Sequence, residues 1–370
     1  MAIVELILPH HRYEIVIEPG SLASLGERVR HLAPHHRAAL VLDRHIEALY
    51  GEETNRSMVN AGYAVSQAAI RPGEERKNLD TIRSLYELLV GTRLERHSPI
   101  VALGGGVVGD TAGFVAATYL RGTPFFQCPT TLLAMVDSSV GGKVGVNLPQ
   151  GKNLIGAFYQ PNLVIIDTDT LNSLPSRELQ CGLAECVKHG MIRDASLFEW
   201  IDNHLDAILG LDRNALVELV RRNVEIKAKV VMADEKEASQ RAELNFGHTF
   251  GHAIEATQAY DSEHGYHHGE AVALGMVAAT RLAVETGRCP QNALDRISAL
   301  LNRIGLPTSA PKLPPPDELV NVMRLDKKVE DDRMRLILPN EVGSVSIVSD
   351  VPVDAIHGAW QFIAGNSRGR

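Results

Sequence analysis

Short apolar runs alternate with helical patterns over the first half of the chain. Tyr13–Ile17 alternates polar and apolar residues, while Ala38–Leu42, Ile100–Leu103 and Leu163–Ile166 are short apolar runs. Between them, Leu79–Val90 repeats its apolar residues at helical spacing. Strands that alternate with helices in this way predict an α/β domain with a parallel sheet.

After Pro175 the pattern changes to almost continuous helix. Six segments repeat apolar residues at helical spacing: Arg177–Met191, Ala195–Ile208, Arg213–Val231, Leu244–Thr257, Gly269–Thr286 and Pro290–Ile304. Two later runs, Met334–Leu338 and Val345–Ile347, predict a hairpin. We therefore predict an α/β domain over residues 1–175, a mainly α-helical domain over residues 176–362 and a flexible polar tail over residues 363–370.

The composition excludes several classes of protein. A chain of 370 residues, 45% hydrophobic and 22% charged, is typical of a globular protein with two domains. Its net charge of -8 provides no general basic field for nucleic acid or an anionic membrane. No apolar run reaches the roughly 18–20 residues of a membrane span, and the N-terminus lacks the basic start of a signal peptide. Four cysteines without a CxxC pair argue against a disulfide scaffold, so we expect a cytoplasmic protein.

A glycine-rich turn follows the apolar run that begins at Ile100. Gly104, Gly106 and Gly109 form a G-x-G-x-x-G pattern between a predicted strand and a helix of small residues. Glycine lets the backbone approach a pyrophosphate, and the N-terminus of a helix presents N–H groups and partial positive charge to it. The pattern therefore predicts a dinucleotide site, with a tight strand–helix turn that binds nothing as the alternative.

The surroundings of this turn differ from the common dinucleotide fold. There, an acidic residue that binds the ribose follows the glycines by about 20 residues. Here the residues that could bind the ribose precede the glycines in the sequence. They are Asp43, at the end of a predicted strand, and Glu74 with Lys77. Thr130 and Thr131 offer further contacts to phosphate or ribose. We interpret this arrangement as a nicotinamide-binding fold of another type.

Histidines gather in the helical half of the chain. His248 and His252 are four residues apart on one predicted helix, and His268 opens the next one. Imidazole suits zinc and similar ions, and Glu185, an acid on an apolar helical face, is a candidate third ligand. His252 is either a fourth ligand or a general acid/base, and the spacing alone does not decide. A purely structural role is the alternative, and it is favoured for His264 and His267.

Basic and polar residues next to paired glycines indicate a pocket for an anionic substrate. Asp137 and Lys143 lie on either side of the glycine pair Gly141-Gly142, and Lys152 and Asn153 follow about ten residues later. Further polar residues occur on the helical segments and after them: Lys188, Lys227, Arg241, Asn245 and the run Asp326-Lys327-Lys328. Any one lysine on a helix usually faces solvent. Together, however, the dinucleotide, metal and cationic signals predict a site between the two domains for a small anionic polyol.

Five stretches of the sequence resemble the 3-dehydroquinate synthase family, and the resemblance runs over nearly the whole chain. The stretches are Gly104–Asp110, Pro129–Lys143, Gly151–Gly156, Asn245–His252 and His268–Glu270. The resemblance implies the dehydroquinate synthase fold, with a nucleotide-binding α/β domain followed by a helical domain. It also implies NAD+, zinc with cobalt as a possible substitute, and a homodimer.

The resemblance assigns residues by position. The implied metal ligands are Glu185, His248 and His268. The implied substrate residues are Asp137, Lys143, Asn153, Lys188, Lys227, Arg241, Asn245, His252 and Lys327, with Arg121 offered across the dimer. The implied cofactor residues are Asp43, Glu74, Lys77, Gly105, Gly106, Val107, Val108, Gly109, Asp110, Thr130, Thr131, Lys143, Lys152 and Ser173. Ser173 departs from the family pattern, since many relatives carry threonine there, but serine keeps the hydroxyl group.

The reaction implied by the resemblance turns 3-deoxy-D-arabino-heptulosonate 7-phosphate into 3-dehydroquinate and phosphate, the second step of the shikimate pathway. It runs through transient oxidation at C5 by NAD+, phosphate elimination, re-reduction, ring opening and intramolecular aldol closure, so no net oxidation results. Three alternatives are a polyol dehydrogenase on the same fold, a sister cyclase that acts on a neutral sugar phosphate, and a dinucleotide-sensing binding protein. The cluster of cationic residues argues against the polyol dehydrogenase, which binds no phosphate. A dinucleotide-sensing protein would not need three metal ligands.

Overall fold

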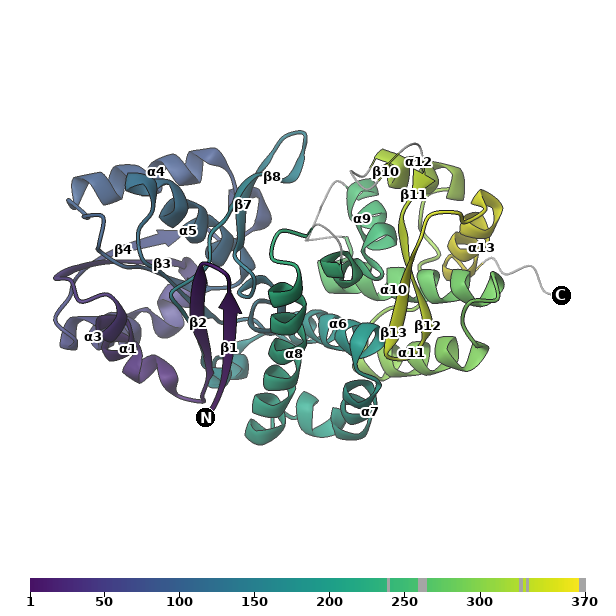
Figure 1. The fold of residues 1–370 in the computed structure, drawn as a ribbon, viewed down its shortest axis with the longest axis horizontal. Coiled ribbons are helices and arrows are strands. Elements are labelled where there is room, and N and C mark those ends of the chain that lie inside the picture. Colours follow the sequence, from purple (N-terminus) through teal and green to yellow (C-terminus); the bar gives the residue numbers. More distant parts are fainter. Residues whose placement is uncertain (238–239, 259–264, 326–328, 331–332, 366–370) are drawn as a thin grey trace. The chain divides into compact units, whose positions relative to one another are not determined.

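The structure is a computed structural model that describes residues 1–237, 240–258, 265–325, 329–330 and 333–365 (Figure 1). The chain forms two compact units. The first contains Met1–Pro175 and Leu211–Lys236, and the second contains Ser176–Gly210 and Glu237–Arg370.

The first unit is built around a seven-stranded sheet. Its strands are β1 (Ala2–Leu8), β2 (His11–Ile17), β3 (Arg37–Asp43), β4 (Ala64–Ile70), β5 (Ile100–Gly104), β6 (Phe125–Pro129) and β9 (Leu163–Ile166), and a separate hairpin pairs β7 (Lys143–Leu148) with β8 (Gly151–Phe158). Its helices are η1 (Ser21–Ser24), α1 (Leu25–Leu32), α2 (Arg44–Ile46), η2 (Glu47–Gly51), α3 (Glu52–Asn60), η3 (Glu74–Arg76), α4 (Leu79–Gly91), α5 (Gly106–Thr118), η4 (Tyr119–Arg121), η5 (Ala134–Ser138), η6 (Thr168–Ser173) and α8 (Arg213–Ala233).

The predicted parallel sheet is confirmed. The strand order is β1-β2-β9-β6-β5-β3-β4, and every neighbouring pair except β1 with β2 runs parallel. Helices cover both faces, with α4 and α5 on one side and α1 and α3 on the other (Figure 1). Val41 of β3 faces the first core and Leu42 faces the second. Because successive side chains alternate between two covered faces, the central strands appear as unbroken apolar runs.

Helix α8 is a correction to the predicted division of the chain. We expected Arg213–Val231 in the helical domain, but α8 belongs to the first unit. It packs against β1, where the Ile7 N–H lies 3.4 Å from the Met232 sulfur, and Lys227 bonds Asp137. An amphipathic pattern specifies that a segment is a helix, but it does not specify which neighbour covers its apolar face.

The second unit is mainly helical, as predicted. Its elements are α6 (Ser176–Arg193), α7 (Ala195–Leu209), η7 (Gln240–Asn245), α9 (His248–Thr257), α10 (His268–Glu285), α11 (Gln291–Ile304), α12 (Pro316–Leu325), β10 (Val329–Glu330), β11 (Arg333–Met334), β12 (Leu336–Glu341), β13 (Ser344–Val348) and α13 (Val353–Ile363). Helix α10 is central and packs against α6, α9, α11 and α13. The predicted late hairpin is the antiparallel pair β12 and β13.

Glycines let the helices of the second unit approach one another closely. A Cβ atom added at Gly269 would lie 2.3 Å from the backbone oxygen of Cys181, so α10 rests directly on α6 there. A Cβ atom at Gly275 would lie 2.0 Å from the Gly247 oxygen, which brings α10 against the start of α9. Gly247 has a φ of 78°, so the predicted helix Leu244–Thr257 begins only at His248, after a short 3-10 helix.

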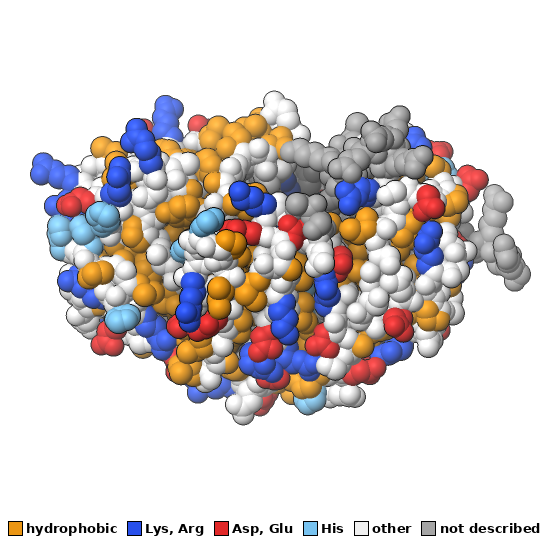
Figure 2. Space-filling model, viewed as in Figure 1, with side chains coloured by type: hydrophobic (Ala, Val, Ile, Leu, Met, Phe, Trp, Pro, Cys, Tyr) orange, Lys and Arg blue, Asp and Glu red, His pale blue; other side chains and the backbone are white. Residues whose placement is uncertain are grey.

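Acidic and basic side chains alternate over the described surface that Figure 2 shows, and no single-sign patch dominates that face. This mixed surface agrees with the modest net charge of -8. Within the described part of the chain, every helix is too short or too polar to span a bilayer.

Candidate functional site

In the first unit, the predicted dinucleotide turn is a close fit of glycines against neighbouring side chains. A Cβ atom at Gly104 would lie 2.7 Å from a Val108 methyl group, and one at Gly106 would lie 3.1 Å from the Ser138 hydroxyl. Helix α5 begins at Gly106 and is preceded by Gly105, whose added Cβ would meet Thr131 at 3.2 Å. These three positions have no room for a side chain, so the turn requires glycine there to keep the start of α5 packed against its neighbours. A helix start of this kind is where proteins commonly bind anions.

Lys77 lies at the centre of a buried polar group beside this turn. Its ammonium donates to Asp110 on α5 and to the side-chain oxygen of Asn153 on β8, both at 2.5 Å. Burial opposes the charge of Lys77, but the carboxylates of Asp110 and Glu74 outweigh it and raise the pKa of the ammonium. Asn147 donates to Glu74 at 2.8 Å, so the β7–β8 hairpin is tied to the same group.

Other predicted cofactor residues have local partners in the first unit. Asp43 accepts the N–H groups of His45 and Ile46 and thereby caps α2. Ser173 shares a hydrogen bond of 2.7 Å with Tyr50. Thr130 is buried and Lys152 is partly exposed. Asp43 and Thr130 thus lie at the carboxyl-terminal ends of β3 and β6, Ser173 lies in η6 after β9, and Lys152 lies on β8 of the separate hairpin.

Predicted substrate residues of the first unit fall into two settings. Lys227 of α8 is buried and donates to Asp137 at 2.5 Å, as well as to the main-chain oxygen of that residue. Lys143, at the start of β7, and Arg121 are exposed, and Arg121 has a φ of 66°. Burial raises the pKa of the Asp110 carboxyl. The ammonium groups of Lys77 and, to a smaller extent, Lys227 oppose this rise.

In the second unit, one carboxylate and two imidazoles converge. A ligand atom of each of Glu185, His248 and His268 lies within 4.8 Å of the others. The Glu185 Oε1 atom is 3.6 Å from His248 Nε2 and 3.8 Å from His268 Nε2. Glu185 is 1% exposed, and its Oε1 atom has no hydrogen-bond partner among the described residues. A buried acceptor of this kind costs free energy unless something satisfies it.

The arrangement fits a divalent ion. The Nδ1 atom of His248 lies 3.1 Å from the Phe246 carbonyl, and that of His268 lies 3.4 Å from the Glu255 carboxylate. Histidines that bind metals use one ring nitrogen for the ion and donate the other N–H to a carbonyl or carboxylate. Both Nε2 lone pairs are thereby directed toward the Glu185 oxygen. The donor set of two imidazoles and a carboxylate is typical of a catalytic zinc site.

Other predicted residues surround these three in the second unit. Lys188 is 1% exposed and bonds the other oxygen of Glu185, which offsets the buried negative charge. The centroid of the His252 ring lies 5.5 Å from that of His248 and 6.5 Å from that of His268. His252 does not belong to the group of ligand atoms formed by Glu185, His248 and His268. Arg241 is buried, and Asn245 donates to Glu237 at 3.1 Å. The predicted substrate residue Lys327 lies outside the described residues.

The sequence interpretation assigned no role to several groups next to these histidines. Glu255 approaches His268, and Arg177 forms a double hydrogen bond of 2.7 Å with Glu270. His267, for which a structural role was favoured, contacts Glu178 at 2.8 Å. The sequence did offer a signal for Glu270, because an acid three residues after the residue that precedes a helix is typical of a capping box.

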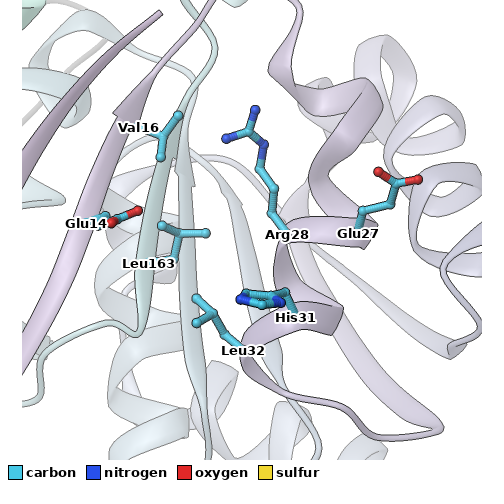
Figure 3. Close-up of a pocket in the computed structure, with 7 residues that line it drawn as sticks. All are labelled: Glu14, Val16, Glu27, Arg28, His31, Leu32 and Leu163. Carbon is cyan, nitrogen blue, oxygen red and sulfur yellow. The ribbon is translucent and has the colours of Figure 1, made fainter.

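A hollow of about 320 Å³ lies elsewhere on the first unit (Figure 3). It separates Val16 and Leu163 on the sheet from Arg28, His31 and Leu32 on α1. Leu163 is the first residue of β9 and Val16 is the last but one of β2, so the hollow lies along the face of the sheet beneath α1. Ligands of open α/β sheets bind instead at the carboxyl-terminal edge of the strands. None of the predicted site residues lines this hollow.

Comparison with known proteins decides the family. The family model described as 3-dehydroquinate synthase N-terminal matches residues 67–181, and the one described as 3-dehydroquinate synthase C-terminal matches residues 182–329. The chain belongs to the 3-dehydroquinate synthase family. The 3-dehydroquinate synthase of Nostoc punctiforme is 44% identical over 362 residues, which are 97% of this chain and 99% of that protein.

Solved structures confirm that the fold is that of the 3-dehydroquinate synthase family and its neighbours. The 2-epi-5-epi-valiolone synthase of Streptomyces hygroscopicus subsp. jinggangensis, solved with NAD+ and Zn2+, is 28% identical with a TM-score of 0.88. It covers 98% of this chain, and 99% of its own length is matched. A 2-deoxy-scyllo-inosose synthase, complexed with carbaglucose-6-phosphate, NAD+ and Co2+, is 26% identical with a TM-score of 0.88 and coverage of 98% and 100%.

Proposed function

We propose that this protein is a 3-dehydroquinate synthase, a carbon–oxygen lyase that cyclises 3-deoxy-D-arabino-heptulosonate 7-phosphate with loss of phosphate. The observation that carries the proposal is the similarity to 3-dehydroquinate synthases over 97% of the chain. The two cyclases of known structure described above are less similar, at 28% and 26% identity. This contrast favours the keto acid over a neutral sugar phosphate.

We assign NAD+ to the first unit. The turn Gly104–Asp110 would hold the pyrophosphate, because it joins β5 to the N-terminus of α5 and a helix N-terminus presents N–H groups and partial positive charge to an anion. The cofactor would accept a hydride and return it in the same turnover. Lys77 supports the assignment, since it holds Asp110 and Asn153 together next to the turn and keeps its charge there.

We assign zinc, with cobalt as a substitute, to Glu185, His248 and His268 of the second unit. A bound ion would polarise the hydroxyl that is oxidised and stabilise the resulting oxygen charge. Lys188 keeps one oxygen of Glu185 engaged, so the carboxylate can offer only the other. His252 is placed one helical turn beyond His248, where its imidazole can move a proton without being a ligand.

The remaining predicted residues are proposed to bind and orient the substrate. Its carboxylate and phosphate need cations, which Lys143, Lys188, Lys227 and Arg241 supply. Lys227 donates to Asp137, so this lysine also fixes the orientation of an acid that is a candidate for moving protons. Asn245, Lys327 and Arg121, the last offered from a second copy in a homodimer, complete the proposed set. We also propose that the enzyme acts in the cytoplasm, as its four free cysteines suggest.

The deciding experiment measures phosphate release from the keto acid phosphate in the presence of NAD+. We expect release without lasting NADH absorbance, loss of release after treatment with a chelator and recovery on addition of zinc. Steady accumulation of NADH from the substrate would instead indicate a polyol dehydrogenase. Turnover of sedoheptulose 7-phosphate with no reaction of the keto acid would assign the chain to a sister cyclase.

A further inference from the structure

Glu255 is a buried acid to which the sequence analysis assigned no role. It lies on α9 two helical turns beyond His248, and therefore on the same face of that helix. Its residue exposure is 6%, and its Oε2 atom lies 3.4 Å from His268 Nδ1. Helix α9 thus carries both the imidazole of His248 and a carboxylate directed at the imidazole of His268 on α10.

The backbone of His268 is fixed by contacts that do not involve its ring. Arg177 of α6 bonds both oxygens of Glu270 at 2.7 Å, and Glu270 accepts the His267 N–H at 2.8 Å. Arg177 also donates to the Gly265 oxygen at 3.0 Å, and Glu178 contacts the His267 ring. With the start of α10 held in this way, the main freedom left to His268 is rotation of its side chain.

We propose that Glu255 is a positioning residue for His268. It accepts the Nδ1–H of the ring, which selects the tautomer with the lone pair on Nε2 and turns that nitrogen toward Glu185. A carboxylate in this position also increases the basicity of the imidazole, which strengthens its bond to an ion. The inference rests on the proposed metal site, and it assigns a role to a residue that touches neither the ion nor the substrate.

Two substitutions and a matched control test the proposal in the full-length protein. Glu255→Met keeps the volume and removes the oxygen acceptor, while Glu255→Gln keeps an oxygen and removes the charge. Glu285→Ala removes an acid from the far end of α10, where it pairs with Arg281. Zinc affinity is measured by competition with a chromophoric chelator, and the ligand field is measured by the visible absorption of the Co2+-loaded protein.

We expect Glu255→Met to bind zinc about 10–100-fold more weakly than the wild type, the usual effect of losing an outer-shell partner. Its Co2+ spectrum should change, Glu255→Gln should show a smaller loss, and Glu285→Ala should match the wild type. Wild-type affinity and an unchanged spectrum in Glu255→Met would overturn the proposal. If circular dichroism shows that Glu255→Met is unfolded, Glu255→Gln decides, and wild-type affinity with an unchanged spectrum in that variant overturns it.

These readouts separate the inference from the proposed function. A wild-type protein that binds zinc tightly but releases no phosphate from the keto acid would refute the function and leave the positioning role of Glu255 to be decided by the affinities. A wild-type protein that releases phosphate and is indifferent to chelator and to Glu255→Met would refute the positioning role and the metal assignment together, while the overall reaction would stand.

Discussion

Replacement of Gly269 by alanine tests whether close helix packing sets the position of His268. The added Cβ would lie 2.3 Å from the Cys181 oxygen and 2.4 Å from its Cα atom. Both atoms belong to the backbone of α6, so no side chain can rotate away. An ordinary contact requires about 3.4 Å, so α10 must move by about 1 Å at the residue next to His268.

This displacement is large compared with the tolerance of a metal site, in which ligand distances vary by only about 0.2 Å. We therefore expect Gly269→Ala to weaken zinc binding by about 10–100-fold, as the loss of ligand support does elsewhere. Overpacking should also lower the free energy of unfolding of the metal-free protein by about 1–3 kcal/mol. Chelator competition measures the first quantity and urea unfolding the second.

Two other glycines provide a graded series for this test. A Cβ atom at Gly251 would lie 3.1 Å from the Ala271 oxygen, so Gly251→Ala should have a smaller effect on both quantities. At Gly91, the last residue of α4, nothing lies within 4 Å, so Gly91→Ala serves as the neutral control. Zinc affinities that did not follow the order Gly91, Gly251, Gly269, or a Gly269→Ala protein equal to the wild type, would refute the reasoning.

Three further predictions follow from buried groups. Lys77→Met should lower the free energy of unfolding by about 3–5 kcal/mol, because it leaves the Asp110 carboxylate without its ammonium partner. Since the pKa of Lys77 is raised in the folded protein, urea unfolding should show this loss throughout the neutral range. The loss should become smaller as the pH rises above about 10.4, where the lysine of the wild type begins to give up its charge. Burial raises the pKa of Tyr63 to about 12, so the wild type should lose stability as the pH rises from about 10 to about 12. Tyr63→Phe should lose less over that interval in the same measurement, and an equal loss would exclude Tyr63 as the cause. Burial also raises the pKa of Cys181 to about 12 and that of Cys289 to about 11, so a disulfide reagent near neutral pH should label the four cysteines slowly before unfolding and rapidly in urea.

Elements with a strong local pattern could be predicted closely from the sequence. The strand Leu163–Ile166 was predicted with the bounds it has, and α7 was predicted to within one residue. The β7–β8 hairpin was missed because its glycines and half-buried residues give no clear alternation. The neighbour of α8 was also misjudged, since the partner of an amphipathic face depends on contacts that are distant in sequence.

The candidate metal group was predictable only in part, for a similar reason. His248 and His268 were conspicuous because glycines and acids surround them, and Glu185 because an acid is unusual on an apolar helical face. Glu255 gave no comparable signal. The proposed role of Glu255 depends on the orientation of the His268 ring on α10. That orientation follows from the packing of α9 against α10, which no spacing along the chain reveals.

The pairing of Glu185 with Lys188 bears on whether the helical unit needs a metal ion in order to fold. Zinc fingers are unfolded without their ion, because the binding of the ion supplies the free energy of folding. Here the ammonium of Lys188, one helical turn away on α6, already neutralises the buried carboxylate. We therefore expect the helical unit to fold without the ion that we assign to it and to bind that ion afterwards. Loading would then be a reversible equilibrium, and we expect the identity of the ion to depend on the metals available as well as on the ligands.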